Sequence, residues 1–265
     1  MKKILVVALF SLLGLITVGV YYYNRWKTLW SMEEPKPIYS VSHPKDDTLR
    51  IVMIGDSWVH MRSESLNKLF QKRLSTISEK PVILKTKGKG GEKARGIYHL
   101  MFLDDEYGTK TLFSSGVDYC VIIVGINDAA ANLGVKQYIY YMKLLLDFML
   151  GNNIRPVLIE IPDVNIWNVY CSKPLKDLII DYMRSLMTFS GMYHYSEYRE
   201  ALKLMLKDSS YSDSVIYVTM KGWNGIGNGV EKSLFLNDQI HLNQQGYIKL
   251  DSCIVDAIGR DLYHI

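Results

Sequence analysis

A short apolar run that ends in a glycine and a serine is the most constraining feature of this chain. Leu49 to Ile54 reads LRIVMI, and its mainly apolar, β-branched residues suit a strand buried on both faces of a parallel sheet. Gly55, Asp56 and Ser57 follow at once, and a helical pattern begins near Arg62. Open α/β sheets bind their ligands at the carboxyl ends of strands. The run therefore predicts an α/β fold with Ser57 at a ligand-binding edge.

Strand-like runs alternate with helical patterns along the rest of the chain. Such alternation predicts a parallel sheet covered by helices on both faces. We expect four further strands, at 81–86, 117–124, 155–161 and 214–219, and main helices at 62–79, 92–103, 135–150, 174–189, 197–207 and 244–258.

Composition narrows the function classes. A chain of 265 residues fits one domain of ordinary size plus an appendage. The net charge of +4, without a basic stripe interleaved with aromatic residues, does not argue for a nucleic-acid partner. The three cysteines and six histidines show no metal-ligand spacing, so neither a metal site nor a disulfide framework is indicated. We expect buried free thiols, with one Cys171–Cys253 bridge left open.

The N-terminal 30 residues predict a membrane anchor or a signal segment. Ile4 to Val20 is uncharged and mainly apolar, and Tyr21 to Tyr23 follow it. A membrane-spanning helix needs about 20 apolar residues, and tyrosines favour the interface at its ends. An uncleaved anchor is the main prediction. A cleaved secretory signal is the alternative, although it favours a shorter apolar core and small residues before the cleavage site.

Between this segment and the first strand lies a proline-containing stretch, residues 31–48, which we interpret as a linker. Residues 49–265 then form the predicted main folded domain. The N-terminal lysines favour a cytoplasmic N-terminus, which places that domain on the extracytoplasmic side of the cell membrane. Under the alternative, the domain is secreted or periplasmic after cleavage.

A serine at a strand end becomes a nucleophile only beside a base. Leu236 to Tyr247 reads LNDQIHLNQQGY, with Asp238 three residues before His241. Asp238 can accept a hydrogen bond from one imidazole nitrogen of His241 while the other nitrogen faces Ser57. These three residues are the predicted catalytic set.

Two further segments offer groups that stabilise an oxyanion. Gly91 lies in KGKGGEKARG after the second strand-like run, and Asn127 lies in GIND after the third. The predicted donors are the backbone N–H groups of Ser57 and Gly91 and the side-chain amide of Asn127.

These blocks resemble those of the SGNH hydrolase family, also called GDSL esterases and lipases. Four blocks occur in the family's order from residue 49 to the C-terminus: Gly55-Asp56-Ser57, a glycine at Gly91, Gly125-Ile126-Asn127-Asp128, and Asp238-Gln239-Ile240-His241. The resemblance implies a three-layer α/β/α, flavodoxin-like sandwich with a five-stranded parallel sheet, and a serine esterase that needs no cofactor or metal. Gly90 stays open as the donor in place of Gly91. Trp58 replaces the usual leucine, a change expected to touch little chemistry.

The predicted function is removal of acyl groups from an O-acylated carbohydrate of the cell envelope. Acyl transfer by the same triad, or a non-catalytic carbohydrate-binding or assembly role, are the alternatives. Trp167, Tyr170 and Trp223 follow the last two strands and are candidates for stacking on sugar rings, with ordinary loop packing the alternative. Protein partners are unknown.

A basic cluster surrounds the predicted Gly91 donor. It contains Lys85, Lys87, Lys89, Lys93 and Arg95. We expect the last three to lie near the rim of the site and to attract an anionic glycan. The alternative is a solvated basic face, or one attracted to anionic lipid head groups.

Overall fold

The computed structural model describes residues 2–31, 41–101, 109–164, 171, 173–188, 191–192, 194–220, 223 and 233–263. The chain forms two compact units, Met1–Lys36 and Pro37–Ile265. The first contains the helix α1 (Lys2–Ser31). Within α1, Lys3–Tyr23 has a mean hydropathy of 2.5 and is long and apolar enough to cross a membrane, by length and composition only. A signal sequence passes the same test, so both interpretations of this segment stand.

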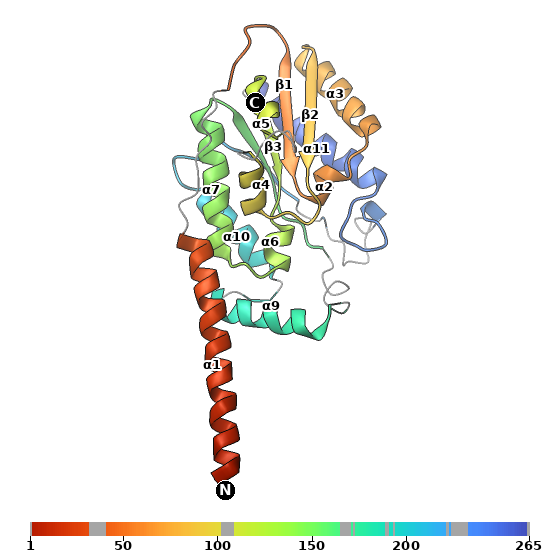
Figure 1. Ribbon diagram of the computed structural model, residues 1–265. Helices are drawn as coiled ribbons and strands as arrows, with labels where there is room; N and C mark the ends of the chain where they lie inside the picture. The colour runs from red at the N-terminus through yellow and green to blue at the C-terminus, as the bar shows by residue number, and fades with distance from the viewer. Residues whose placement is uncertain are drawn as a thin grey trace. The chain divides into compact units, whose positions relative to one another are not determined.

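The second unit is built on a five-stranded parallel sheet in the order β2-β1-β3-β4-β5 (Figure 1). This is the flavodoxin-like order, and it confirms the predicted fold class. The strands are β1 (Leu49–Gly55), β2 (Val82–Gly88), β3 (Tyr119–Ile123), β4 (Arg155–Ile159) and β5 (Ile216–Val218).

Helices cover both faces of the sheet (Figure 1). One layer contains α3 (Glu64–Ser78) and α11 (Gln244–Leu262), which pack on each other. The other contains α4 (Ala94–Leu100), α7 (Val135–Gly151) and α10 (Tyr195–Met205). The remaining helices are α2 (Ser57–His60), α5 (Thr109–Ser114), α6 (Ile126–Ala130) and α9 (Leu175–Thr188).

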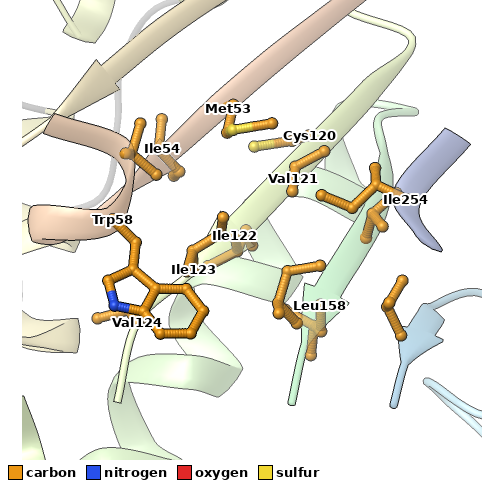
Figure 2. Close-up of a cluster of buried hydrophobic side chains, with 14 of the residues drawn as sticks. Met53, Ile54, Trp58, Cys120, Val121, Ile122, Ile123, Val124, Leu158 and Ile254 are labelled. Carbon is orange, nitrogen blue, oxygen red and sulfur yellow. The ribbon is translucent and has the colours of Figure 1, made fainter. Parts of the chain in front are cut away.

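The central strands form the hydrophobic core. Every residue of β3 is buried, and β1 is buried at all positions except Arg50. Figure 2 shows Met53 and Ile54 of β1 beside Cys120 to Val124 and Leu158, with Ile254 of α11 approaching from one face. Burial on both faces explains why these strands appear in the sequence as nearly continuous apolar runs.

The structure places most element boundaries within two residues of those predicted, with local reasons for the differences. The helix predicted from Arg62 begins at Glu64 because Ser63 is its N-cap and accepts a hydrogen bond from the N–H of Leu66. The helix predicted at 92–103 is the shorter α4, and residues 102–103 lie outside the described part of the chain. The one-turn helices α2 and α6 and the short α5 were not predicted.

The described part of the predicted linker contacts the domain. Ser42 Oγ donates to the carbonyl of Ser114 at 3.0 Å, and His43 Nε2 lies 2.8 Å from the carbonyl oxygen of Asn152. Cys120 is buried, as expected, but Cys171 is exposed, and both are free thiols together with Cys253. The open alternative of a Cys171–Cys253 bridge is therefore not formed.

Candidate active site

Ser57 lies where β1 ends and α2 begins. A side chain at Gly55 would place its Cβ 2.2 Å from the carbonyl oxygen of Ile123, so this close approach between strands requires glycine. Asp56 then caps α2: its Oδ1 accepts from the N–H of Trp58 at 3.1 Å. Asp56 thus supports the turn that carries Ser57. The turn leaves Ser57 half-buried at the carboxyl edge of the sheet.

The structure brings Ser57, His241 and Asp238 into one chain of hydrogen bonds. His241 Nε2 lies 3.0 Å from Ser57 Oγ, and His241 Nδ1 lies 2.6 Å from Asp238 Oδ2. The other oxygen of Asp238 accepts from the backbone N–H groups of Ile240 and His241, both at 2.9 Å. The imidazole is thus oriented from one side by a carboxylate that is itself fixed by its own loop.

These contacts also set the charge state of Asp238. Partial burial acts to raise its pKa, but the hydrogen bonds from the His241 ring and from two backbone N–H groups outweigh burial and hold the pKa below its ordinary value. Asp238 is therefore ionised at neutral pH. An ionised carboxylate stabilises an imidazolium better than a neutral acid does.

Trp58 links the two halves of this arrangement through a contact that the sequence did not predict. Its side chain is 1% exposed, and its indole Nε1 donates to the carbonyl of Ile240 at 3.0 Å. The ring also lies 6.3 Å from that of Phe235, and Figure 2 shows it at the end of the core near Val124. Trp58, beside Ser57, thereby holds the loop that carries His241. A buried tryptophan needs a partner for its N–H, but the sequence alone does not show which group supplies it.

Asn127 and Gly91 line one cavity of about 350 Å³. Asn127, in α6, donates through Nδ2 to the carbonyl of Glu92 at 3.0 Å and to Asp56 Oδ2 at 3.3 Å. Gly91 has φ +72°, the left-handed region that favours glycine. Of the two candidate glycines, Gly91 is the one whose position lines the cavity.

Two buried carboxyl groups support this side of the site. Asp128 accepts from the N–H of Ala94 at 3.0 Å, which ties the Asn127 turn to the start of α4 just after Gly91. Burial raises the pKa of Asp128 to about 7. Burial, and secondarily the nearby Asp128, also raise the pKa of Asp56 to about 7.

The cavity has charged walls of both signs. Its lining contains Gly91, Lys93, Asn127, Ala130, Ala131, Lys173, Asp177, Ile180, Asp181 and Arg184. Lys93 therefore lies at the site, as predicted, whereas Lys89 pairs with Glu92 at 3.1 Å.

Trp223 is buried with Lys249 Nζ 5.1 Å from its ring centroid, which is packing rather than an open stacking surface. Trp167 and Tyr170 lie outside the described residues.

Comparisons with known proteins give the fold. No family model matches the chain, and no curated protein matches it. Solved structures do match. A lipase/acylhydrolase from Enterococcus faecalis is 17% identical, with a TM-score of 0.56 over 80% of this chain and 95% of its own. The psychrotrophic esterase EstA from Pseudoalteromonas sp. is 18% identical, with a TM-score of 0.56 over 82% of this chain and 100% of its own.

A third match is an acetylxylan esterase from Geobacillus stearothermophilus, which is 15% identical, with a TM-score of 0.54 over 80% of this chain and 94% of its own. At these identities the similarity establishes the fold alone. The chain has the fold of the SGNH, or GDSL, hydrolases, as the order of its sequence blocks predicts.

Proposed function

We propose that this protein is a serine ester hydrolase of the SGNH type. The single observation that carries the proposal is the continuous hydrogen-bond chain from Asp238 through His241 to Ser57. It lies at the carboxyl edge of the sheet, where folds of this class bind ligands. The fold shared with lipases and esterases supports the same reaction class.

In this proposal, His241 acts first as a base. Its Nε2 takes the proton of Ser57 Oγ as that oxygen attacks the ester carbonyl, and Asp238 stabilises the resulting imidazolium. The imidazolium then gives its proton to the leaving alcohol, and the acyl group stays on Ser57. Water, deprotonated by His241, attacks the acyl-enzyme and releases the carboxylic acid, and the proton returns to Ser57.

The oxyanion of each tetrahedral intermediate would be stabilised by three donors: the backbone N–H groups of Ser57 and Gly91 and the Asn127 amide. The longer of the two bonds that Asn127 Nδ2 makes is the one to Asp56, at 3.3 Å. We expect this bond to be the one exchanged for the oxyanion, while the 3.0 Å bond to the Glu92 carbonyl keeps the amide in place.

The proposed substrate is an acetyl-like O-acyl ester of an envelope carbohydrate, met on the extracytoplasmic side. The span Lys3–Tyr23 supports a location at or beyond the membrane. A cavity with charged walls of both signs beside Gly91 and Asn127 suits a polar, hydroxyl-rich alcohol better than a long alkyl chain. One of the solved structures with this fold is described as an acetylxylan esterase, which agrees with a proposed substrate of the acetylated-carbohydrate class.

The decisive experiment combines covalent labelling with hydrolysis. A fluorophosphonate probe should label the wild-type protein, and Ser57→Ala should lose both labelling and ester cleavage while its free energy of unfolding changes by no more than about 1 kcal/mol. Ser209→Ala, at an exposed serine after α10, is the matched control and should keep both. Full hydrolysis by Ser57→Ala would refute the assignment. Acyl esters of varied chain length, assayed with and without acceptor sugars, separate hydrolysis from transfer.

A further inference from the structure

The helix α9 turns its apolar side chains outward and its polar ones inward. Its buried residues are Asp181 and Ser185. Its exposed large apolar residues are Leu175, Ile179, Tyr182 and Leu186, with 52% to 72% of each side chain accessible. Their spacings of four, three and four residues place them on one face of the helix. Figure 1 shows α9 at the periphery of its unit, away from the sheet.

Ion pairs fix this orientation. The side chain of Asp181 is 5% exposed, and it binds Lys173 Nζ at 2.6 Å and Arg184 Nη1 at 3.4 Å. Lys173 and Arg184 also reach the carbonyl oxygens of Ala130 and Ala131. Rotating the apolar face inward would break these ion pairs and the contacts with the Ala130 and Ala131 carbonyls.

We propose that the exposed face of α9, formed by Leu175, Ile179, Tyr182 and Leu186, docks on the surface of a lipid bilayer. Helices with an apolar face and a charged opposite face lie in the membrane interface with the apolar side chains inserted. Tyrosine is well suited to that depth. Lys176, exposed beside the apolar face, can contact anionic head groups.

The short distance in sequence between the apolar span and the domain favours a bilayer as the partner of this face. The apolar span ends at Tyr23, and the described part of the second unit begins at Val41, with 17 residues between them in the sequence. Even fully extended, that length reaches only about 60 Å. Retention of the span therefore confines the domain to the neighbourhood of a membrane, where the local concentration of lipid surface is high.

The dimensions of the face argue against a second protein molecule. A helix of 14 residues is about 21 Å long and 10 Å wide, so one face offers roughly 200 Å². A stable protein interface buries about 800 Å² on each partner. A bilayer needs no such complementary surface, because insertion of a few apolar side chains adds to a tether that already exists.

Docking would bring the site to the membrane surface. The opposite face of α9 lines the cavity through Asp177, Ile180, Asp181 and Arg184. If the proposed esterase function holds, the cavity would receive acyl esters that are themselves carried at the lipid surface. This consequence rests on the proposed function, but the docking does not.

The test places fluorophores on the full-length protein in vesicles of phosphatidylcholine and phosphatidylglycerol. Cys171→Ser and Cys253→Ser remove the accessible thiols, and Cys120 is buried. One fluorophore is attached at Tyr182→Cys. The control fluorophore is attached at Leu204→Cys, a leucine of α10 that is 68% exposed. Quenching is measured with iodide in the water and with a nitroxide-bearing lipid.

We expect the fluorophore at position 182 to be quenched by the nitroxide lipid and protected from iodide several-fold more than that at position 204. Equal quenching of both positions by iodide would overturn the proposal. Protection of position 182 from both quenchers would overturn it too, because it would show coverage by protein.

A second measurement uses Ile179→Ser combined with Leu186→Ser, with Leu204→Ser as the matched control. The double variant should lose several-fold in kcat/KM for an ester held in vesicles and keep its kcat/KM for a short water-soluble ester. Equal activity on the vesicle-held ester would count against docking. Absence of hydrolysis of every ester would refute the proposed function instead, and leave the quenching result to decide the docking.

Discussion

The two walls of the candidate site are built in opposite ways. The wall that carries Ser57 is backed by the apolar core, with Trp58 1% exposed, and hydrogen bonds hold Trp58 Nε1 and His241 Nδ1 to their partners. The wall formed by α9 has polar residues buried and apolar residues exposed. The first wall is packed like the interior of the domain. The second wall exposes apolar side chains, as surfaces that bind a partner or a membrane do.

This difference assigns separate tasks to the two walls. Dense packing holds side chains in single rotamers, so the wall of Ser57 can keep reacting groups within the few tenths of an ångström that catalysis needs. The α9 wall turns charged side chains toward the cavity and apolar side chains toward the solvent, so it suits the proposed recognition of substrate and membrane. The predictions below test the first wall and then the boundary between the two.

The largest expected effect concerns Asn127, on the catalytic side of the cavity. Asn127→Ala should lower kcat by roughly 100- to 1,000-fold, because one oxyanion donor is lost, and should change KM little. Because the amide also holds the Glu92 carbonyl, thermal unfolding of the variant must be measured alongside. A folded variant with nearly wild-type kcat would remove Asn127 from the oxyanion site.

The second prediction concerns pH and the buried Asp128. Its pKa is about 7 in the folded protein, against about 3.9 in an unfolded chain. The folded state therefore holds a proton that the unfolded state releases, and this group lowers stability as pH rises from about 4 to 7. Asp128→Asn has no proton to lose. Its free energy of unfolding relative to wild type should rise across that window, by up to about 1.4 kcal/mol per pH unit.

Urea unfolding at a series of pH values measures this difference. Asp256→Asn, at an exposed carboxylate of α11, is the matched control. A difference between Asp128→Asn and wild type that stays level from pH 4 to 8 would show that Asp128 titrates normally.

The sequence predicts the central strands and the motifs at their ends well, and the orientation of α9 poorly. β1 and β3 are buried on both faces, so nearly every residue in them is apolar and the strands are easy to predict. Ser57, Asn127 and His241 lie in short motifs that follow a strand or precede a helix. The amphipathic pattern of residues 174–189 predicts a helix equally well, but it does not say which face is turned inward. That choice depends on Asp181 meeting Lys173 and on the carbonyls of Ala130 and Ala131, which belong to another segment.

The role of Trp58 was also hidden, for a related reason. Its partner, the carbonyl of Ile240, is a backbone group 182 residues away, and any sequence offers such groups everywhere. When a side chain bonds a distant backbone group, the residue type of the partner gives no indication of the bond. Motif reasoning therefore predicted Ser57, Asp238 and His241, which the structure brings together, and missed the hydrogen bond from Trp58 to their loop.

The third prediction measures that link. Trp58→Phe keeps most of the buried volume and removes the donor to Ile240, so the loop of His241 should lose one restraint. We expect kcat to fall about tenfold, the equivalent of one hydrogen bond, with KM little changed. Trp223→Phe, at a tryptophan buried elsewhere, is the matched control for the loss of an indole. Equal effects of the two variants would mean that Trp58 contributes only packing.

The smallest expected effect concerns Lys93, which lies at the boundary between the walls. Its Nζ is 3.3 Å from the carbonyl oxygen of Gly91, and its side chain lines the cavity together with Arg184 of α9. A cation at this place raises the local concentration of an anionic substrate, and salt weakens the effect. Lys93→Glu should therefore raise KM several-fold for an acylated anionic glycan and leave that for a neutral aryl acetate nearly unchanged. Lys207→Glu, at an exposed lysine beyond α10, controls for net charge. Both substrates are measured at low and high salt. Equal changes in KM for the two substrates, or no salt dependence of KM for the anionic one, would show that Lys93 does not select substrates by charge. Recognition would then depend on the uncharged groups of the cavity.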